Sequence, residues 1–315
     1  MDPASLMRIK NLQLRAKVIV EGFFSGLHRS PYHGFSVEFT EYRQYTPGDD
    51  LRYLDWRLYA RTDRFYIKRF EDETNLRCTL LLDLSRSMGF GSLAYTKADY
   101  ARTLAATLAY FLSQQRDAVG LLTFADQLAE YLPARYRPGH LHRLMLGLEQ
   151  SLLGNDTRFG PPLEQIGRSV SKRGLLVLIS DLLAPLDELE KELGYLRSRG
   201  HEMVVFRLLD PVEASFRWDE SALFEDLETG RELYVDPTSV RDEYLRRFEA
   251  HANSLRTLCG SLGVDLIPVL TDEPLEKTLF DFLQARLRRG RQVLRRVGGE
   301  GWGTSGRAKT GGSTG

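Results

Sequence analysis

Three oxygen-bearing side chains stand at alternate positions directly after an apolar run. The run CTLLLDL ends on Asp83, and Ser85 and Ser87 follow in the segment DLSRS. Alternate side chains of an extended segment point the same way, so the carboxylate and the hydroxyls can converge on one spot. Hard oxygen donors of this kind suit Mg²⁺ or Mn²⁺, whereas zinc prefers cysteine and histidine. The spacing therefore favours a site for one divalent cation, without an accompanying general base.

Two further polar residues occur where they could join this group. Thr157 lies in the polar loop LLGNDTRFGPPL between two predicted helices, and Asp181 follows Ser180 at the end of the apolar run LLVLIS. Hydroxyls are neutral, so a cage of serines, a threonine and one or two aspartates leaves a divalent ion short of negative charge. An acidic residue of a protein partner is the natural donor of the missing charge. The pattern predicts a bound metal ion that contacts a partner protein directly.

Other interpretations of the same residues stay open. Asp and Ser after a strand are common N-caps of the next helix, and a structural domain with a vestigial site is possible. Asp83 could instead be the nucleophile of a metal-dependent phosphoryl-transfer or hydrolytic enzyme. Position 85 is a serine, so no proton carrier is evident, and no histidine belongs to a recognisable catalytic motif. The segment GFGSLA (89–94) matches a dinucleotide fingerprint, but it lies too far from the strand end to cradle a phosphate.

The elements that position these residues alternate from residue 76 onward. Apolar runs of strand length, such as AVGLLTFA and HEMVVFRLLD, are each followed by a helical stretch, and residues 223–236 read as a hairpin. This order predicts an α/β fold with a doubly wound, mostly parallel sheet that helices cover on both faces. Ligands bind such sheets at the carboxyl ends of strands, near a switch in strand order. Asp83 and Asp181 both stand at a carboxyl end, so we expect them to share a site.

The chain is expected to have three parts. Residues 1–75 interrupt the alternation and predict a helix at about 5–20 followed by a β extension. Residues 76–288 form the main α/β domain. Residues 289–315 are rich in Gly, Ser and Arg with few apolar groups, which predicts a disordered tail.

Composition narrows the class of partner and the compartment. The 315 residues include 43 acidic and 43 basic ones, so the formal net charge is zero and bulk attraction to nucleic acid or to an anionic membrane is not indicated. The two cysteines, Cys78 and Cys259, lie far apart and fit a reducing compartment. The amino-terminal segment lacks the apolar core of a signal peptide, and no apolar run is long enough to cross a bilayer. We expect a cytoplasmic protein without a membrane span.

The segments DLSRS, NDT and ISD, in this order on an α/β alternation, resemble the metal-ion-dependent adhesion site of the von Willebrand factor A family. The resemblance covers about residues 76–288 and implies a Rossmann-like A-type fold. It implies that Asp83, Ser85, Ser87 and Thr157 are direct or near-direct ligands of one Mg²⁺ or Mn²⁺ ion. It also implies that Asp181 binds the ion through a water molecule.

The segment EFTEYRQYTPGDDLRYLDWRLYARTDRFYIKRFEDE (38–73) resembles the signature of the bacterial "domain of unknown function 58" family. Members carry an A-type domain behind this segment and are typically encoded beside a MoxR-type AAA+ ATPase. The resemblance implies an adaptor or chaperone-like role with such an ATPase or its client, which would present an acidic residue. Many members have amino-terminal membrane helices, and this sequence looks like the short soluble form.

Charged and aromatic residues alternate densely in the same segment. They can pair with one another and fasten the extension to the main domain, because arginine also stacks on Trp and Tyr. Alternatively, they form a surface for a partner protein. The residues of this possible partner surface are Arg43, Arg52, Asp55, Trp56, Arg57 and Arg61.

Overall fold

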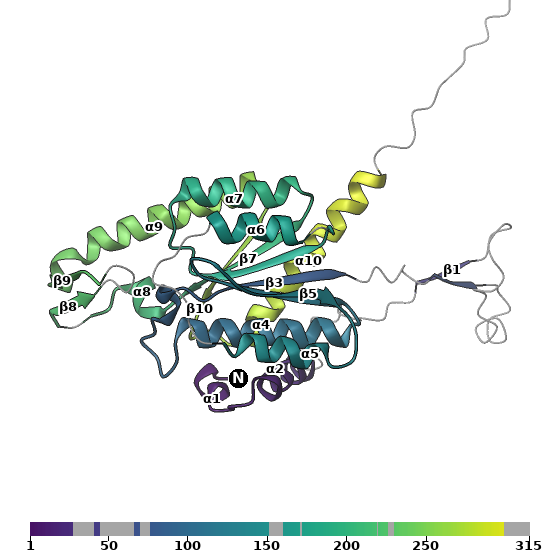
Figure 1. Ribbon diagram of the computed structural model, residues 1–315, viewed down its shortest axis with the longest axis horizontal. Coiled ribbons are helices and arrows are strands. Elements are labelled where there is room, and N and C mark those ends of the chain that lie inside the picture. The colour runs from purple at the N-terminus through teal and green to yellow at the C-terminus, as the bar shows by residue number, and fades with distance from the viewer. Residues whose placement is uncertain are drawn as a thin grey trace, which may run out of the picture.

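A six-stranded sheet lies at the centre of the computed structural model, which describes residues 1–27, 41–44, 66–69, 76–150, 160–170, 172–218, 220–225 and 230–298 (Figure 1). The strand order is β10-β7-β6-β3-β4-β5. Neighbouring strands pair in parallel, except that β5 runs antiparallel to β4. The predicted mostly parallel α/β fold is confirmed. The strands are β3 (Arg77–Asp83), β4 (Ala118–Phe124), β5 (Leu128–Arg135), β6 (Leu175–Ser180), β7 (Glu202–Leu209) and β10 (Asp265–Leu270).

Helices cover both faces of this sheet, and a separate apolar cluster fills each interface (Figure 1). One face carries α4 (Lys97–Gln114), α5 (His140–Leu148) and α10 (Leu275–Gly298). The opposite face carries α6 (Gly160–Ser169), α7 (Leu186–Ser198) and α9 (Pro237–Ser261). Because both sides are covered, β4 and β6 are buried along their whole length, which explains their unbroken apolar sequences.

The amino-terminal residues add a further layer outside α4. The single helix predicted at about 5–20 is two helices, α1 (Pro3–Met7) and α2 (Leu12–Leu27), because the Asn11 side chain accepts the backbone N–H of Leu14 at 2.8 Å and starts a new helix. The apolar residues of α2 join the same buried cluster as α4. Arg15 of α2 donates a hydrogen bond to the Thr103 hydroxyl of α4 at 2.7 Å and so links these two helices. These helices therefore share the core of the α/β body.

Several boundaries differ from the sequence-based expectation. The antiparallel strand β5 and the short helix α8 (Pro211–Ser215) were not predicted. The helix α10 continues to Gly298, past the start of the predicted tail, and residues 299–315 lie outside the described part. The predicted hairpin is confirmed as β8 (Ala222–Glu225) and β9 (Glu232–Val235), which pair antiparallel. In the amino-terminal extension, β1 (Glu41–Gln44) pairs antiparallel with β2 (Tyr66–Arg69).

Two expectations from the sequence concern membrane-spanning helices and the two cysteines. Within the residues that the structure describes, we find no helix with the length and apolar character needed to span a bilayer. Cys78 and Cys259 are both buried and unpaired, so they act as small core residues.

Gly120 provides a test of how closely β4 and β5 pack. The register of the two strands shifts between Val119 and Leu121, and a Cβ atom at Gly120 would lie 2.7 Å from the Ala134 nitrogen and 2.8 Å from the Leu132 carbonyl oxygen. Backbone cannot move aside cheaply, so we expect Gly120→Ala to destabilise the fold by about 1–3 kcal/mol in chemical denaturation. Gly260 on α9 has open space around its Cβ position, and Gly260→Ala should leave stability unchanged or raise it by up to about 1 kcal/mol. Equal effects of the two changes would contradict the close β4–β5 approach.

Candidate metal centre

The predicted aspartates meet at the point where the strand order reverses. The chain passes from β3 to β4 on one side and later returns to β6, on the other side of β3. Asp83 is the last residue of β3, and Asp181 directly follows β6. Both side chains are fully buried, and their charges interact. This is the position at which doubly wound sheets bind ligands.

Asp83 accepts hydrogen bonds at both carboxylate oxygens. The backbone N–H of Ser85 donates to Oδ1 at 2.9 Å, and the Ser180 hydroxyl donates to Oδ2 at 2.6 Å. Burial, followed by the negative charge of Asp181, nevertheless raises the pKa of Asp83 to about 6, although these hydrogen bonds oppose the shift. Among the described residues, no lysine or arginine forms an ion pair with this carboxylate.

The hydroxyls of Ser85 and Ser87 lie together, and the Ser85 hydroxyl interacts with the Asp83 carboxylate. Ser87 lies in the 3₁₀ turn η2 (Arg86–Gly89), which Ser85 precedes without capping it through its side chain. The two Oγ atoms are 3.1 Å apart and hydrogen-bonded, and both residues are buried. The hydroxyls are therefore not used as helix caps, whereas Asp83 does accept a local backbone N–H. This geometry fits a pair of hydroxyl donors to a cation better than it fits a cap.

A buried lysine that was not predicted from the sequence completes the cluster. Lys97, in the first turn of α4, is only 1% exposed, and its Nζ lies 2.9 Å from Asp181 Oδ2 and 2.7 Å from Glu213 Oε1. Burial acts to lower the pKa of Lys97, but the two carboxylates together outweigh it and the pKa is raised. A lysine in the first turn of a helix is unfavourable for the helix dipole. This unfavourable position is the sequence signal by which Lys97 could have been singled out.

Glu213 reaches the site from α8, whose start is held by reciprocal hydrogen bonds. The Glu213 carboxylate accepts the backbone N–H of Asp210 at 2.9 Å, and Asp210 accepts the N–H of Val212 at 2.9 Å. Asp210 also accepts the N–H and the hydroxyl of Ser92, at 2.8 and 2.5 Å. The loop before α4 and the helix α8 are therefore joined beside the candidate metal centre.

The backbone next to Asp181 adopts a conformation that is unfavourable for its residue type. Leu182 has φ of 55°, in the left-handed region, and is fully buried. Its N–H donates to the Ser180 hydroxyl at 3.0 Å, the same hydroxyl that donates to Asp83. Strained residues of this kind persist where surrounding contacts hold them, and they occur often at functional sites.

The donor set fits a hard divalent cation. Within the described ranges, no three Asp, Glu, His or Cys side chains gather as a metal-binding cluster. What is brought together instead is the Asp83 carboxylate, which forms no ion pair with these residues, the Asp181 carboxylate held by Lys97, and two hydroxyls. Mg²⁺ and Mn²⁺ accept such mixed oxygen donors. Asp83, Ser85, Ser87 and Asp181 are thus in one place, while Thr157 lies outside the described residues.

The possible partner surface in the amino-terminal extension lies almost wholly outside the structure's described ranges. Only the backbone of Arg43, in β1, is described. The choice between a fastening and a partner surface therefore remains a prediction, and it concerns Arg52, Asp55, Trp56, Arg57 and Arg61.

The solved structures that align with this chain are remote from it in sequence. An aerotolerance-related membrane protein from Bacteroides fragilis aligns with a TM-score of 0.47 and 17% identity, covering 67% of this chain and 98% of that one. BatB from Bacteroides thetaiotaomicron aligns with a TM-score of 0.46 and 15% identity, covering 68% and 99%. The SpRpn10 VWA domain aligns with a TM-score of 0.38 and 13% identity, covering 65% and 94%.

Sequence relatives include one that covers nearly the whole chain. The uncharacterized protein Rv1480 of Mycobacterium tuberculosis is 30% identical over 293 residues, which is 91% of each chain. The uncharacterized protein MAV169 of Mycobacterium avium is 28% identical over 128 residues, 40% of this chain and 74% of that one. The family described as "Protein of unknown function DUF58" matches residues 41–254. The chain belongs to the DUF58 family.

Proposed function

We propose that this protein is a divalent-cation-dependent protein-binding module. The cation is one Mg²⁺ or Mn²⁺ ion, held by Asp83, Ser85 and Ser87, with Thr157 as a further ligand and Asp181 acting through a water molecule. The bound ion would supply a positive charge that accepts a carboxylate from a partner. The chain's own residues orient the donors and exclude bulk water from them.

The observation that carries this proposal is the unmatched charge of Asp83. Its carboxylate is fully buried beside Asp181 and has no ion pair among the described residues, while the adjacent hydroxyls of Ser85 and Ser87 contact each other. Around the centre, the carboxylates Asp83, Asp181 and Glu213 face the cations Lys97 and Arg207. The negative charges of these groups exceed the positive ones. A divalent ion would make the net charge of the site positive, which favours capture of an external carboxylate.

The partner we propose is a MoxR-type AAA+ ATPase or its client, met in the cytoplasm, with this chain as adaptor or chaperone-like component. Purified protein should retain the ATPase in pull-down experiments with Mg²⁺ and lose it in chelator. Ser85→Ala removes a hydroxyl donor from the ion, so its retention in Mg²⁺ should fall by at least about tenfold.

Ser198→Ala is the matched control for that experiment, because Ser198 is an exposed serine on α7 whose hydroxyl donates to the Tyr195 carbonyl oxygen of the same helix. It should bind as the wild type does. Equal recovery of the ATPase with and without chelator would show that the metal is not the contact.

A metal-dependent phosphoryl-transfer or hydrolytic enzyme that uses Asp83 is the second candidate function. Asp83 is buried next to the hydroxyls of Ser85 and Ser87, but no histidine lies among its hydrogen-bond partners in the described part of the chain. We therefore expect no turnover of phosphate esters or peptides by this chain alone in Mg²⁺ or Mn²⁺. Metal-dependent hydrolysis that Asp83→Asn abolishes would favour the enzyme over the binding module.

A further inference from the structure

Arg207 is a buried cation that forms no ion pair with a carboxylate among the described residues, although the charges of Asp181 and Glu213 lie near it. It interrupts the apolar run of β7 and is only 3% exposed. Its Nη2 lies 3.3 Å from His251 Nδ1, its guanidinium lies over the Phe248 ring at 5.2 Å, and its Nε is 3.5 Å from the Asp181 carbonyl oxygen. Throughout the described residues, no carboxylate forms an ion pair with it. Buried guanidinium groups normally have such a partner.

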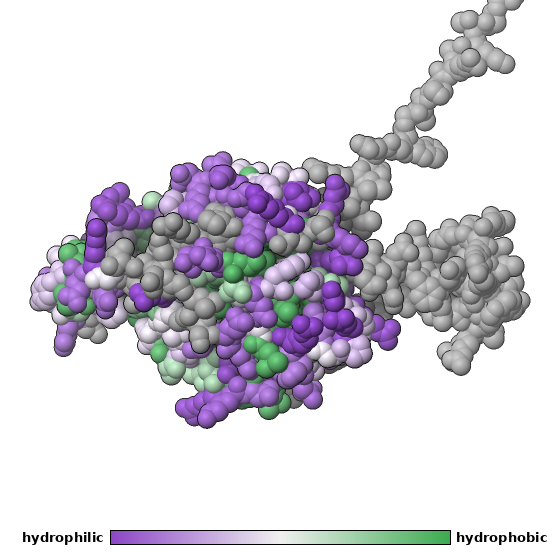
Figure 2. Space-filling model, in the orientation of Figure 1, coloured by the Kyte–Doolittle hydropathy of each residue, from purple (hydrophilic) through white to green (hydrophobic). Residues whose placement is uncertain are grey.

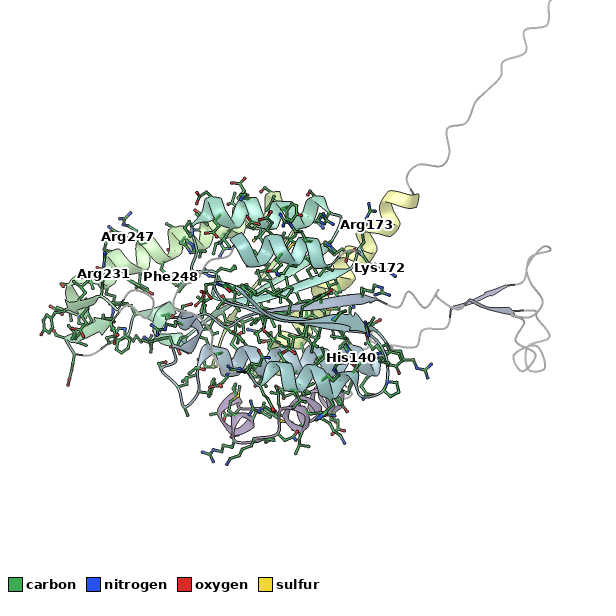
Figure 3. The ribbon with its side chains drawn as sticks, in the orientation of Figure 1. His140, Lys172, Arg173, Arg231, Arg247 and Phe248 are labelled. Carbon is green, nitrogen blue, oxygen red and sulfur yellow. The ribbon has the colours of Figure 1, made fainter. Side chains whose placement is uncertain are left out.

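This guanidinium lines an open cavity next to the candidate metal centre. The cavity has a volume of about 540 Å³ and lies between α9 and the carboxyl ends of β6 and β7. Leu183, Pro185 and Phe248 form apolar walls. Asp181, which belongs to the candidate metal centre, also lines the cavity. Figure 3 shows that Arg247 and Phe248 both come from α9. Arg207 can therefore meet a group that enters from outside the protein.

An aromatic crevice of about 360 Å³ adjoins the Arg207 cavity. It lies between η2, α8, α9 and the β8–β9 hairpin, and Glu213 and Tyr244 line both spaces. The Tyr244 hydroxyl donates to the Glu213 carbonyl oxygen at 2.9 Å. The rings that line the crevice are those of Phe90, Phe216, Trp218, Phe224 and Tyr244.

Apolar side chains are also exposed around these two spaces. Leu183 is 47% exposed beside the cavity, and Leu223 is 57% exposed on the hairpin. Figure 2 shows apolar residues at the surface of the hairpin end of the molecule. A cation in a cavity, next to an aromatic crevice with an apolar rim, is typical of a site that anchors a short peptide segment.

We propose that the Arg207 cavity and the aromatic crevice together bind a partner peptide segment in which an Asp or Glu side chain neighbours a large apolar side chain. The carboxylate pairs with the Arg207 guanidinium, and the apolar side chain enters the crevice. This rests on the proposed function only in taking the partner to be a protein, and it adds which segment of the partner is recognised. It requires no metal, because Arg207 supplies the charge.

The surroundings favour a carboxylate over a phosphate. One guanidinium fork matches the two oxygens of one carboxylate. Asp181 and Glu213 line the same cavity, and their negative charges would repel a doubly charged phosphate more strongly than a singly charged carboxylate. Arg247 also lines the cavity, and its charge is partly offset by its ion pair with Glu243.

Dye-labelled hexapeptides with blocked ends can test this by fluorescence polarisation in chelator. Each acidic peptide carries one Asp or Glu beside Trp, Phe or Leu, and is matched by an Asn or Gln version and by a phosphoserine version. The acidic peptides should bind the wild-type protein at least about tenfold more tightly than their amide versions. Arg207→Gln should remove this preference, whereas Trp218→Ala should weaken all the peptides and keep the preference. Arg246 is an exposed arginine on α9 that does not line either space, and Arg246→Ala should bind the peptides as the wild type does.

Equal binding of acidic and amide peptides to the wild type, or tighter binding of the phosphoserine peptides, would overturn the proposal. If Arg207→Gln does not fold, the acid-to-amide ratio of the wild type and the loss in Trp218→Ala still decide the outcome. Failure of these peptides to bind while the protein still binds Mg²⁺ removes this inference alone. Failure to bind Mg²⁺ while the peptides still bind in chelator removes only the metal.

Discussion

Lys97→Met is expected to lower the free energy of unfolding by about 3–5 kcal/mol, because it leaves buried negative charge without its cation. In the described part of the chain, Lys97 is the one cation that forms an ion pair with Asp181 and with Glu213, at 2.9 and 2.7 Å. Methionine fills a similar volume, so most of the loss reflects electrostatics rather than a cavity. Urea denaturation in chelator measures the effect.

Lys277→Met is the matched control for this substitution. Lys277 pairs with Glu273 at 2.6 Å on the surface, and exposed pairs contribute about 0–1 kcal/mol. Saturating Mg²⁺ should restore part of the stability of Lys97→Met, since a bound ion supplies positive charge beside Asp181. A Lys97→Met protein as stable as the Lys277→Met protein would show that the ion pairs of Lys97 with Asp181 and Glu213 contribute little to the fold.

Asp83→Asn is expected to separate the folding role of this side chain from its metal role. In chelator the change should alter stability by less than about 1 kcal/mol. The substitution weakens a hydrogen bond from Ser180 or Ser85, and it also removes the repulsion between Asp83 and Asp181. In the wild type, Mg²⁺ at 100 times its dissociation constant should add about 2.7 kcal/mol, and Asp83→Asn should lose this gain.

Asp117→Asn is the control for the metal response. Asp117 is largely buried at the opposite end of β3, where it accepts the backbone N–H of Leu76 at 3.0 Å. Asp117→Asn should lower the free energy of unfolding, and Mg²⁺ should still raise it by the same amount as in the wild type. If Asp83→Asn responded to Mg²⁺ as fully as Asp117→Asn, Asp83 would not be a ligand.

Much of the fold followed from the apolar runs. Strands such as β4 and β6 are buried on both faces, so their sequences carry no alternation and indicate a parallel sheet directly. The meeting of Asp83 and Asp181 was predictable for the same reason, because both stand at carboxyl ends and adjacent parallel strands bring these ends together.

The remaining features depend on contacts between distant segments. Lys97 meets Glu213 across 116 residues of sequence, and no local pattern encodes that pair. Arg207 looks out of place in an apolar strand, but only the fold shows a cavity beside it. The strand β5 was missed because its sequence contains Pro133 and is only partly buried, as suits an edge strand.

Calorimetric titration of the wild-type protein with Mg²⁺ tests the metal-dependent binding module most directly. We predict saturable binding of one ion per chain, and the same titration of Asp83→Asn should give no binding heat. An absence of binding by the wild type at millimolar Mg²⁺ and Mn²⁺, in protein that melts cooperatively, would contradict the proposed metal centre.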